Sequence, residues 1–143
     1  MKNSYALITG ATSGIGLEIS KDLAKRGFNL VLVARTKEKL NQTAKELIQE
    51  YNIKCDYFAS DLTLINSPEE IYQFTSKKLY SVDILVNNAG YALPNAFHIN
   101  SMEDEEKCIR LLGTSVIALT KKYINDMISN GSGKIMIVSS VAA

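Results

Sequence analysis

Five short apolar segments alternate with longer amphipathic segments along the 143-residue chain. Such alternation with short connections is typical of a parallel sheet whose strands are joined by right-handed helical crossovers. Because the apolar segments show little polar alternation, we expect helices on both faces of the sheet. The pattern predicts an α/β protein with a single domain over residues 1–143 and a doubly wound parallel sheet that stops after its fifth strand. The predicted strands are Tyr5–Thr9, Leu30–Ala34, Cys55–Ala59, Ile84–Asn87 and Lys134–Ser139.

Two helices are predicted in the first half of the chain. The first begins at Gly14–Ile15 and ends near Arg26, because the following Gly27 suits the position just after a helix. Apolar residues spaced three and four apart across residues 40–48 indicate the second helix.

Two further helices are predicted in the second half. Ser67 is expected to cap the third helix, with Pro68 as its first residue and Glu70 completing a capping box. Ser101 is expected to cap the fourth and longest helix, which runs to about Asn130.

A glycine-rich turn, Thr9-Gly10-Ala11-Thr12-Ser13-Gly14-Ile15-Gly16, follows the first predicted strand. Gly10 permits a tight turn, Gly14 lets the backbone approach a pyrophosphate, and Gly16 lets the helix lie close to the sheet. Backbone amides and the positive helix end then face the phosphates. The turn predicts a Rossmann-like dinucleotide site and the strand order 3-2-1-4-5. A plain turn without a ligand is the alternative; a P-loop is disfavoured because no Lys followed by Ser or Thr closes the motif.

Three later segments occur in an order that, together with the GxxxGxG turn, resembles the short-chain dehydrogenase/reductase family over essentially the whole chain. They are Asp61-Leu62, Asn87-Asn88-Ala89-Gly90 and the run Ile135–Ser140. The resemblance implies that Asp61 and Leu62 border the adenine and that Ser140 is the catalytic serine, with Ser139 facing the sheet. The implied cofactor-binding residues are Gly10, Thr12, Ser13, Gly14, Ile15, Gly16, Arg35, Asp61, Leu62, Asn87, Asn88, Ala89 and Gly90.

The second predicted strand ends at Arg35 and has no carboxylate at its tip. An NAD-selective site places Asp or Glu about 20 residues past the glycine turn, whereas a guanidinium can bond a 2′-phosphate and stack on adenine. Ser13 can donate to the same phosphate, and Lys39 is a weaker second cation. We therefore predict NADP(H) rather than NAD(H), the alternative being that Arg35 is only solvated.

The catalytic set implied by the resemblance is incomplete in these 143 residues. In the family a tyrosine handles the proton and a lysine lowers its pKa, which matches the chemical need for an acid poised near neutral pH. None of the seven tyrosines has lysine four residues later, and the family's YxxxK would fall beyond Ala143. Leu112 occupies the position where the resemblance implies an asparagine that supports a water relay. We expect no turnover by this chain alone.

Charge and cysteine usage exclude several classes of function. The formal net charge is +1, from 16 basic and 15 acidic residues that are intermixed. We therefore expect neither a nucleic-acid nor a membrane partner. Cys55 and Cys108 lie far apart without nearby histidines, so reduced thiols and no metal site are predicted. No signal or spanning segment is recognisable, and we expect a cytoplasmic protein.

Three functional hypotheses remain. The first is an NADP(H)-dependent oxidoreductase acting on a small carbonyl or alcohol substrate, of which the chain is the amino-terminal portion. The second is a non-catalytic NADP(H)-binding module, and the third is the product of a disrupted gene. Apolar residues on more than one side of the fourth helix and the bare edge of the fifth strand predict a homo-oligomer.

Overall fold

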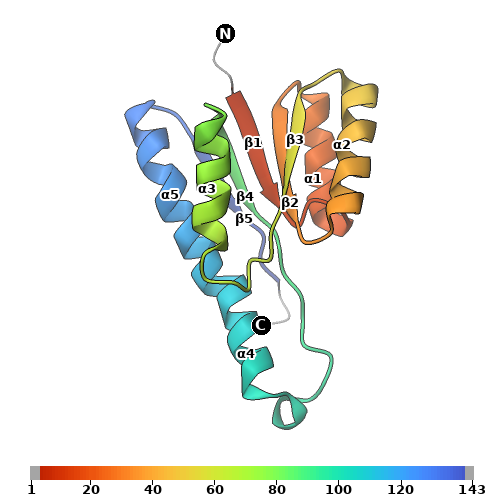
Figure 1. Cartoon of the computed structure of the whole chain (residues 1–143), viewed down its shortest axis with the longest axis vertical. Coiled ribbons are helices and arrows are strands. Elements are labelled where there is room, and N and C mark those ends of the chain that lie inside the picture. The colour runs from red at the N-terminus through yellow and green to blue at the C-terminus, as the bar shows by residue number, and fades with distance from the viewer. Residues whose placement is uncertain (1–3, 141–143) are drawn as a thin grey trace.

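The computed structural model describes residues 4–140 and contains a five-stranded parallel sheet (Figure 1). The strand order is β3-β2-β1-β4-β5, so the predicted fold class and order are confirmed. β4 begins three residues before the predicted position, because the polar Ser81 and Asp83 bond to each other and Asp83 accepts from Ser4 of β1. The strands are β1 (Ser4–Thr9), β2 (Asn29–Ala34), β3 (Cys55–Ala59), β4 (Ser81–Asn87) and β5 (Lys134–Ile137).

Helices cover both faces of the sheet (Figure 1). α1 (Gly14–Lys25) and α2 (Lys37–Tyr51) pack on one face, while α3 (Ser67–Lys77) and α5 (Ser115–Ser129) pack on the other. A loop with a short 3₁₀ turn (Phe97–Ile99) leads to α4 (Met102–Ile109), which projects beyond the sheet. No helix in residues 4–140 is long and apolar enough to cross a membrane.

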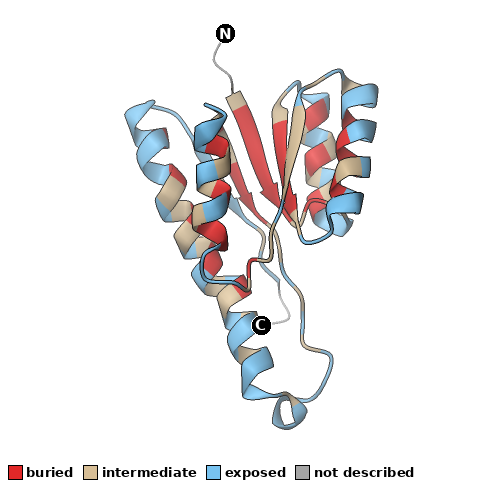
Figure 2. Cartoon of the chain, in the orientation of Figure 1, coloured by how far each residue is buried: buried red, intermediate tan, exposed pale blue. Residues whose placement is uncertain are grey.

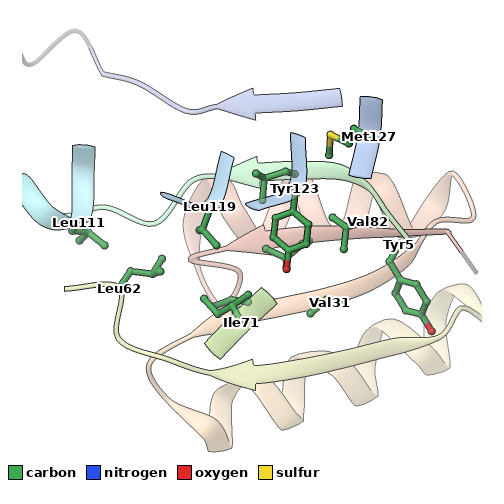
Figure 3. Packing of buried hydrophobic residues seen from close by; sticks show 12 residues of the cluster. Tyr5, Val31, Leu62, Ile71, Val82, Leu111, Leu119, Tyr123 and Met127 are labelled. Carbon is green, nitrogen blue, oxygen red and sulfur yellow. The ribbon is translucent and has the colours of Figure 1, made fainter. Parts of the chain in front are cut away.

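Alternate side chains of β1 belong to two separate hydrophobic cores, because successive residues of a strand point to opposite faces. Leu7 joins Ile71 of α3 and Tyr123 of α5 on one face, whereas Ile8 joins Leu40 of α2 on the other. Figure 3 shows Ile71 and Tyr123 in the first of these cores. Figure 2 shows β1 as the most completely buried strand, with exposure rising toward the sheet edges. Each fully buried Leu or Ile contributes about 1.5–3 kcal/mol, so β1 is the central support of the fold.

Two predictions about the third helix and the last strand were wrong. Asn66, and not Ser67, is the residue before α3, and the buried Ser67 hydroxyl instead donates to the Asp61 carbonyl oxygen at 2.5 Å. β5 ends at Ile137 rather than Ser139, because the last bond to β4 runs from Val138 N to the Asn87 oxygen. The start of α3 therefore depends on the loop before it, and the end of β5 depends on where its partner β4 ends.

The predicted fourth helix is interrupted. Ser101 does cap it, since its side chain accepts from the Asp104 amide at 3.1 Å. However, a π-turn over Arg110–Thr114 separates α4 from α5. The apolar side chains of Ile117, Ile128 and Ile137 remain on the surface at 60%, 70% and 58% exposure, and the predicted homo-oligomer through α5 or β5 stays a prediction.

Leu79 occupies a backbone conformation that suits glycine. α1 and α5 are followed by Gly27 and Gly131 with positive φ, and Asn52 ends α2 at φ 54°. Leu79 takes the equivalent place after α3 at φ 56°, where its amide bonds to the Ser76 oxygen at 3.0 Å. Its side chain is 83% exposed, so core packing gives little compensation for the strain.

We predict that Leu79→Gly stabilises the protein by about 0.5 kcal/mol. Relief of left-handed strain is worth about 1–2 kcal/mol, and the greater unfolded-state entropy of glycine offsets about 0.4–1 kcal/mol of that gain. Chemical denaturation measures the difference. Asn52→Gly is the matched control and should change stability by a few tenths of a kcal/mol at most, since asparagine tolerates this conformation. A destabilised Leu79→Gly protein would contradict the prediction.

Candidate functional site

The glycine turn lies where the chain reverses direction across the sheet. β1 pairs with β2 on one side and with β4 on the other. The helix after β1 covers one face, whereas the helical segment after β4 covers the opposite face. In such sheets the ligand binds outside the carboxyl ends of the strands at this switch point. The candidate site is therefore the edge formed by the carboxyl ends of β1 and β4.

A hydrogen-bonded clamp joins these two strand ends. The buried Thr9 hydroxyl donates to the Val86 oxygen at 3.3 Å and accepts from the amides of Asn88 and Ala89 at 2.9 and 3.0 Å. In return, Asn88 Nδ2 donates to the carbonyl oxygens of Thr9 and Gly10 at 3.0 and 3.3 Å. This Thr9–Asn88 clamp fixes the start of the turn against β4. Thr9 is a residue of the site that the sequence pattern does not predict; the available signal is a polar residue at the end of an apolar strand.

Two glycines of the turn are required by close contacts. A Cβ at Gly16 would stand 2.2 Å from the Gly10 oxygen and 2.3 Å from Asn88 Nδ2. A Cβ at Gly10, which has φ 66°, would stand 2.9 Å from the Ala89 Cα. This is the close approach of helix and sheet that the sequence predicts for Gly16.

Gly14 differs from its neighbours because the space around it is open. It is exposed, has φ 52°, and an added Cβ would meet nothing within 4 Å. The first helical bond of α1 runs from Leu17 N to the Ser13 oxygen, so the amides of Gly14, Ile15 and Gly16 have no acceptor in the helix. This geometry fits an anionic ligand above Gly14.

The amides at the start of the turn are already used within the protein. Gly10 N and Ala11 N both donate to the Val33 oxygen, at 2.8 and 3.4 Å. They hold the turn against the end of β2. The ligand-facing donors are therefore restricted to the later part of the turn, from Thr12 onward.

The predicted adenine-side residues surround the ends of β2 and β3. Arg35 is exposed directly after β2, and Ser13 is exposed in the turn. Asp61 follows β3, where its Oδ1 accepts from the Thr63 amide and hydroxyl at 2.9 and 2.8 Å. Leu62 is buried at 5% exposure and lies in the core rather than on an open surface (Figure 3).

The residues after β4 point in different directions. Asn87 is buried and its Nδ2 lies 3.5 Å from the Thr120 hydroxyl of α5, while its Oδ1 has no hydrogen-bond partner within the described residues. Asn88 instead faces the glycine turn through the clamp. Gly90 is exposed and adjoins Leu112, whose Cδ2 would lie 2.9 Å from an added Gly90 Cβ.

The two serines after β5 are both exposed. Ser140 follows the strand at the same carboxyl edge as the glycine turn, as predicted. Ser139 lies beyond the last hydrogen bond between β4 and β5, which Val138 N donates, and its orientation toward the sheet stays a prediction.

Burial changes the acidity of three tyrosines that lie away from the glycine turn, Tyr5, Tyr80 and Tyr123. Burial raises the pKa of Tyr5 to about 12, helped by its contact with Tyr80, on which it stacks at 4.0 Å. Burial likewise raises the pKa of Tyr80 and of Tyr123. These phenols are weaker acids than a free tyrosine, and they lie in the core at a distance from the glycine turn along their strands and helix.

A family model described as short chain dehydrogenase matches residues 4–143. The chain belongs to the short-chain dehydrogenase family. This agrees with the resemblance carried by the glycine turn and the Asn87–Gly90 segment.

Curated relatives of this short-chain dehydrogenase chain include reductases of several kinds. A fatty acyl-CoA reductase of Acinetobacter baylyi is 35% identical, with 99% of this chain and 48% of the relative covered. Human 17-beta-hydroxysteroid dehydrogenase type 3 is 36% identical, with 95% and 44% covered. The chain spans about half the length of the curated relatives that it matches.

Two solved structures, a short-chain dehydrogenase and a reductase, superpose closely on the chain. One from Sphingobium yanoikuyae in complex with NADPH has a TM-score of 0.90 and 33% identity, with 96% of this chain and 54% of that chain covered. L-sorbose reductase from Gluconobacter frateurii, solved with NADPH and L-sorbose, has a TM-score of 0.91 and 28% identity, with 99% and 54% covered.

We predict that Gly16→Ala lowers the free energy of unfolding by at least about 2 kcal/mol, because the new Cβ meets backbone that cannot move aside. Gly113→Ala is the matched control, since a Cβ there meets nothing within 4 Å and stability should not fall. Urea denaturation followed by circular dichroism measures both. Equal stability of the two variants would contradict the close packing of α1 on the clamp.

Proposed function

We propose that the chain binds NADP(H) across the carboxyl ends of β1 and β4. On this proposal it forms the nucleotide-binding half of an oxidoreductase that transfers hydride between a nicotinamide and a carbonyl or alcohol carbon. The observation that carries the proposal is the clamped glycine turn, with helical amides beside Gly14 that have no acceptor in the helix and Arg35 at the tip of the adjacent strand. Membership of the short-chain dehydrogenase family supports it.

The fit to a dinucleotide is supported by the shape and charge of the turn. The open space above Gly14 accepts a phosphate without steric conflict, and the amides of Gly14 and Ile15 are donors at the positive end of α1. Because Gly10 and Ala11 are bonded to Val33, we assign the pyrophosphate to Thr12–Gly16. The adenosine half then extends toward β2 and β3, and the nicotinamide half extends toward Ala89, Gly90 and β5.

The preference for NADP(H) rests on Arg35. Its exposed side chain stands at the tip of β2, where the strand carries no carboxylate, and its guanidinium can bond a 2′-phosphate with two parallel donors. Asp61, which follows the neighbouring strand β3, accepts hydrogen bonds from the Thr63 amide and hydroxyl, and these bonds reduce its capacity to accept from a ribose hydroxyl. Both of the solved structures described above contain NADPH, which supports the same choice.

The proposed substrate class is a small carbonyl or alcohol compound, with Ser140 orienting the reacting oxygen. The names of the relatives cover acyl-CoA and steroid substrates and therefore do not narrow the class further. The bound nicotinamide supplies the hydride chemistry; this chain supplies binding and orientation through the residues above.

Arg35→Gln should weaken NADPH binding at least about tenfold and leave NADH binding nearly unchanged, because only NADPH carries the 2′-phosphate. Tenfold corresponds to about 1.4 kcal/mol, which is typical of a hydrogen bond to a charged group. Titration calorimetry measures both ligands at fixed salt.

Arg26→Gln is the matched control for that experiment. Arg26 ends α1 at the opposite edge of the sheet, where it pairs with Asp22 at 2.8 Å. Both variants lose one positive charge, so a general electrostatic effect would weaken binding equally. Equal losses, or an equal loss of NADH affinity at Arg35→Gln, would refute the specific role of Arg35.

The alternative function is a binding module without turnover, formed by these 143 residues alone. None of the seven tyrosines has lysine four residues later, and burial raises the pKa of Tyr5 and Tyr123 rather than lowering it. General acid catalysis near pH 7 needs the opposite shift. We therefore expect the 143-residue chain to bind NADPH but not to oxidise it when a ketone is added. Steady loss of NADPH absorbance with the wild type but not with Ser140→Ala would overturn this expectation.

A further inference from the structure

The π-turn between α4 and α5 presents one apolar side chain to the candidate site. Leu111 and Leu112 are neighbours in this turn, yet Leu111 is buried at 7% exposure and Leu112 is 52% exposed. Figure 3 shows Leu111 in the core near Leu62. Leu112 instead adjoins Gly90, since its Cδ2 would lie 2.9 Å from a Cβ added there. Single π-turns inside helices occur frequently at functional sites.

Contacts connect Leu112 to the glycine turn through the segment after β4. Gly10 lies against Ala89, whose Cα would be 2.9 Å from an added Gly10 Cβ. Ala89 is followed by Gly90, and Gly90 lies against Leu112. A ligand that starts at Gly14 and passes the end of β4 therefore reaches Leu112 next. Neither Ala89 nor Gly90 has a side chain long enough to separate the ligand from the leucine.

The Leu112 side chain is an apolar surface beside Gly90 and offers no hydrogen-bonding group there. A half-exposed leucine beside an exposed glycine leaves apolar surface that a flat ring can cover, whereas a charged or strongly hydrated group gains nothing there. The adenosine side offers Arg35 and Ser13, and the pyrophosphate site offers backbone amides. The two ends of the candidate site thus differ in chemistry: the end beside β2 suits a phosphate, and the end beside Gly90 suits a ring.

We propose that Leu112 is a positioning residue for the nicotinamide ring, which packs against the Leu112 side chain and the Gly90 backbone. This inference rests on the proposed NADP(H) function. It assigns Leu112 a direct apolar contact with the cofactor, beside a glycine that leaves room for the ring. A Cβ there would meet the leucine tip before the ring could approach.

The test compares a complete cofactor with a fragment that lacks the ring. NADPH and 2′-phospho-ADP-ribose share every group except the nicotinamide. Leu112→Ala should weaken NADPH binding about fivefold, equal to about 1 kcal/mol, and leave binding of 2′-phospho-ADP-ribose unchanged. Calorimetry measures both dissociation constants. As a second readout, the emission of bound NADPH should shift toward that of the free cofactor in Leu112→Ala, because the ring loses its apolar neighbour.

Ile109→Ala is the matched control. Ile109 is also apolar, 64% exposed and in the same helical segment, but a Cβ added at Gly90 would meet Leu112 and not Ile109. The Ile109→Ala protein should bind both ligands like the wild type. Leu112→Asn, which keeps the size but adds an amide, should resemble Leu112→Ala.

The two possible failures are distinguishable. If the wild type binds neither NADPH nor 2′-phospho-ADP-ribose, the proposed function fails. If the wild type binds both and Leu112→Ala changes neither constant, or changes both equally, the role of Leu112 is wrong while NADP(H) binding stands. Equal weakening by Ile109→Ala would also overturn the role, since it would indicate a general change in the helical segment.

Discussion

The Thr9–Asn88 clamp is the interaction on which the candidate site depends. One buried hydroxyl and one amide satisfy five backbone groups where two parallel strands end. Such groups are costly to bury unpaired, so the clamp both closes the sheet edge and fixes the separation of the strand ends. The glycine turn takes its shape from this contact, since Gly10 and Gly16 can approach Asn88 only without side chains.

The clamp also divides the carboxyl edge of the sheet into two regions with different contacts. Bonds from Gly10 and Ala11 to Val33 hold the turn toward β2, while Ala89 and Gly90 hold the opposite side toward the π-turn. The amides beside Gly14 lie between these regions and are the donors left available. Rigid contacts on both sides therefore present a small set of donors, which is the arrangement that preorganised recognition of an anion requires.

The sequence predicted the parallel sheet and its order because the strands at the centre are buried on both faces and read as continuous apolar runs. It predicted the start of α1, since the glycines mark the turn. It did not predict where β5 ends, which the length of β4 decides, or that Ser67 serves the loop before α3 through a bond to Asp61. Thr9 was not assigned to the site either, because its role depends on Asn88, a residue 79 positions away. Local patterns carry no information about such pairings.

The π-turn has a consequence for how the loop after β4 is directed. One additional residue in a helical turn rotates the preceding part of the helix by about 100° relative to the part after the turn. Leu119 and Tyr123 fix α5 on the sheet. The parts that rotate are therefore α4 and the segment that contains Phe97 and His98. Removal of a single residue between Arg110 and Thr114 would turn that whole segment toward a different side of the molecule and would displace the buried Leu111, while Leu119 and Tyr123 keep α5 on the sheet. A change in helical phase would thus alter the surroundings that we propose for the nicotinamide ring, with no change in the sheet.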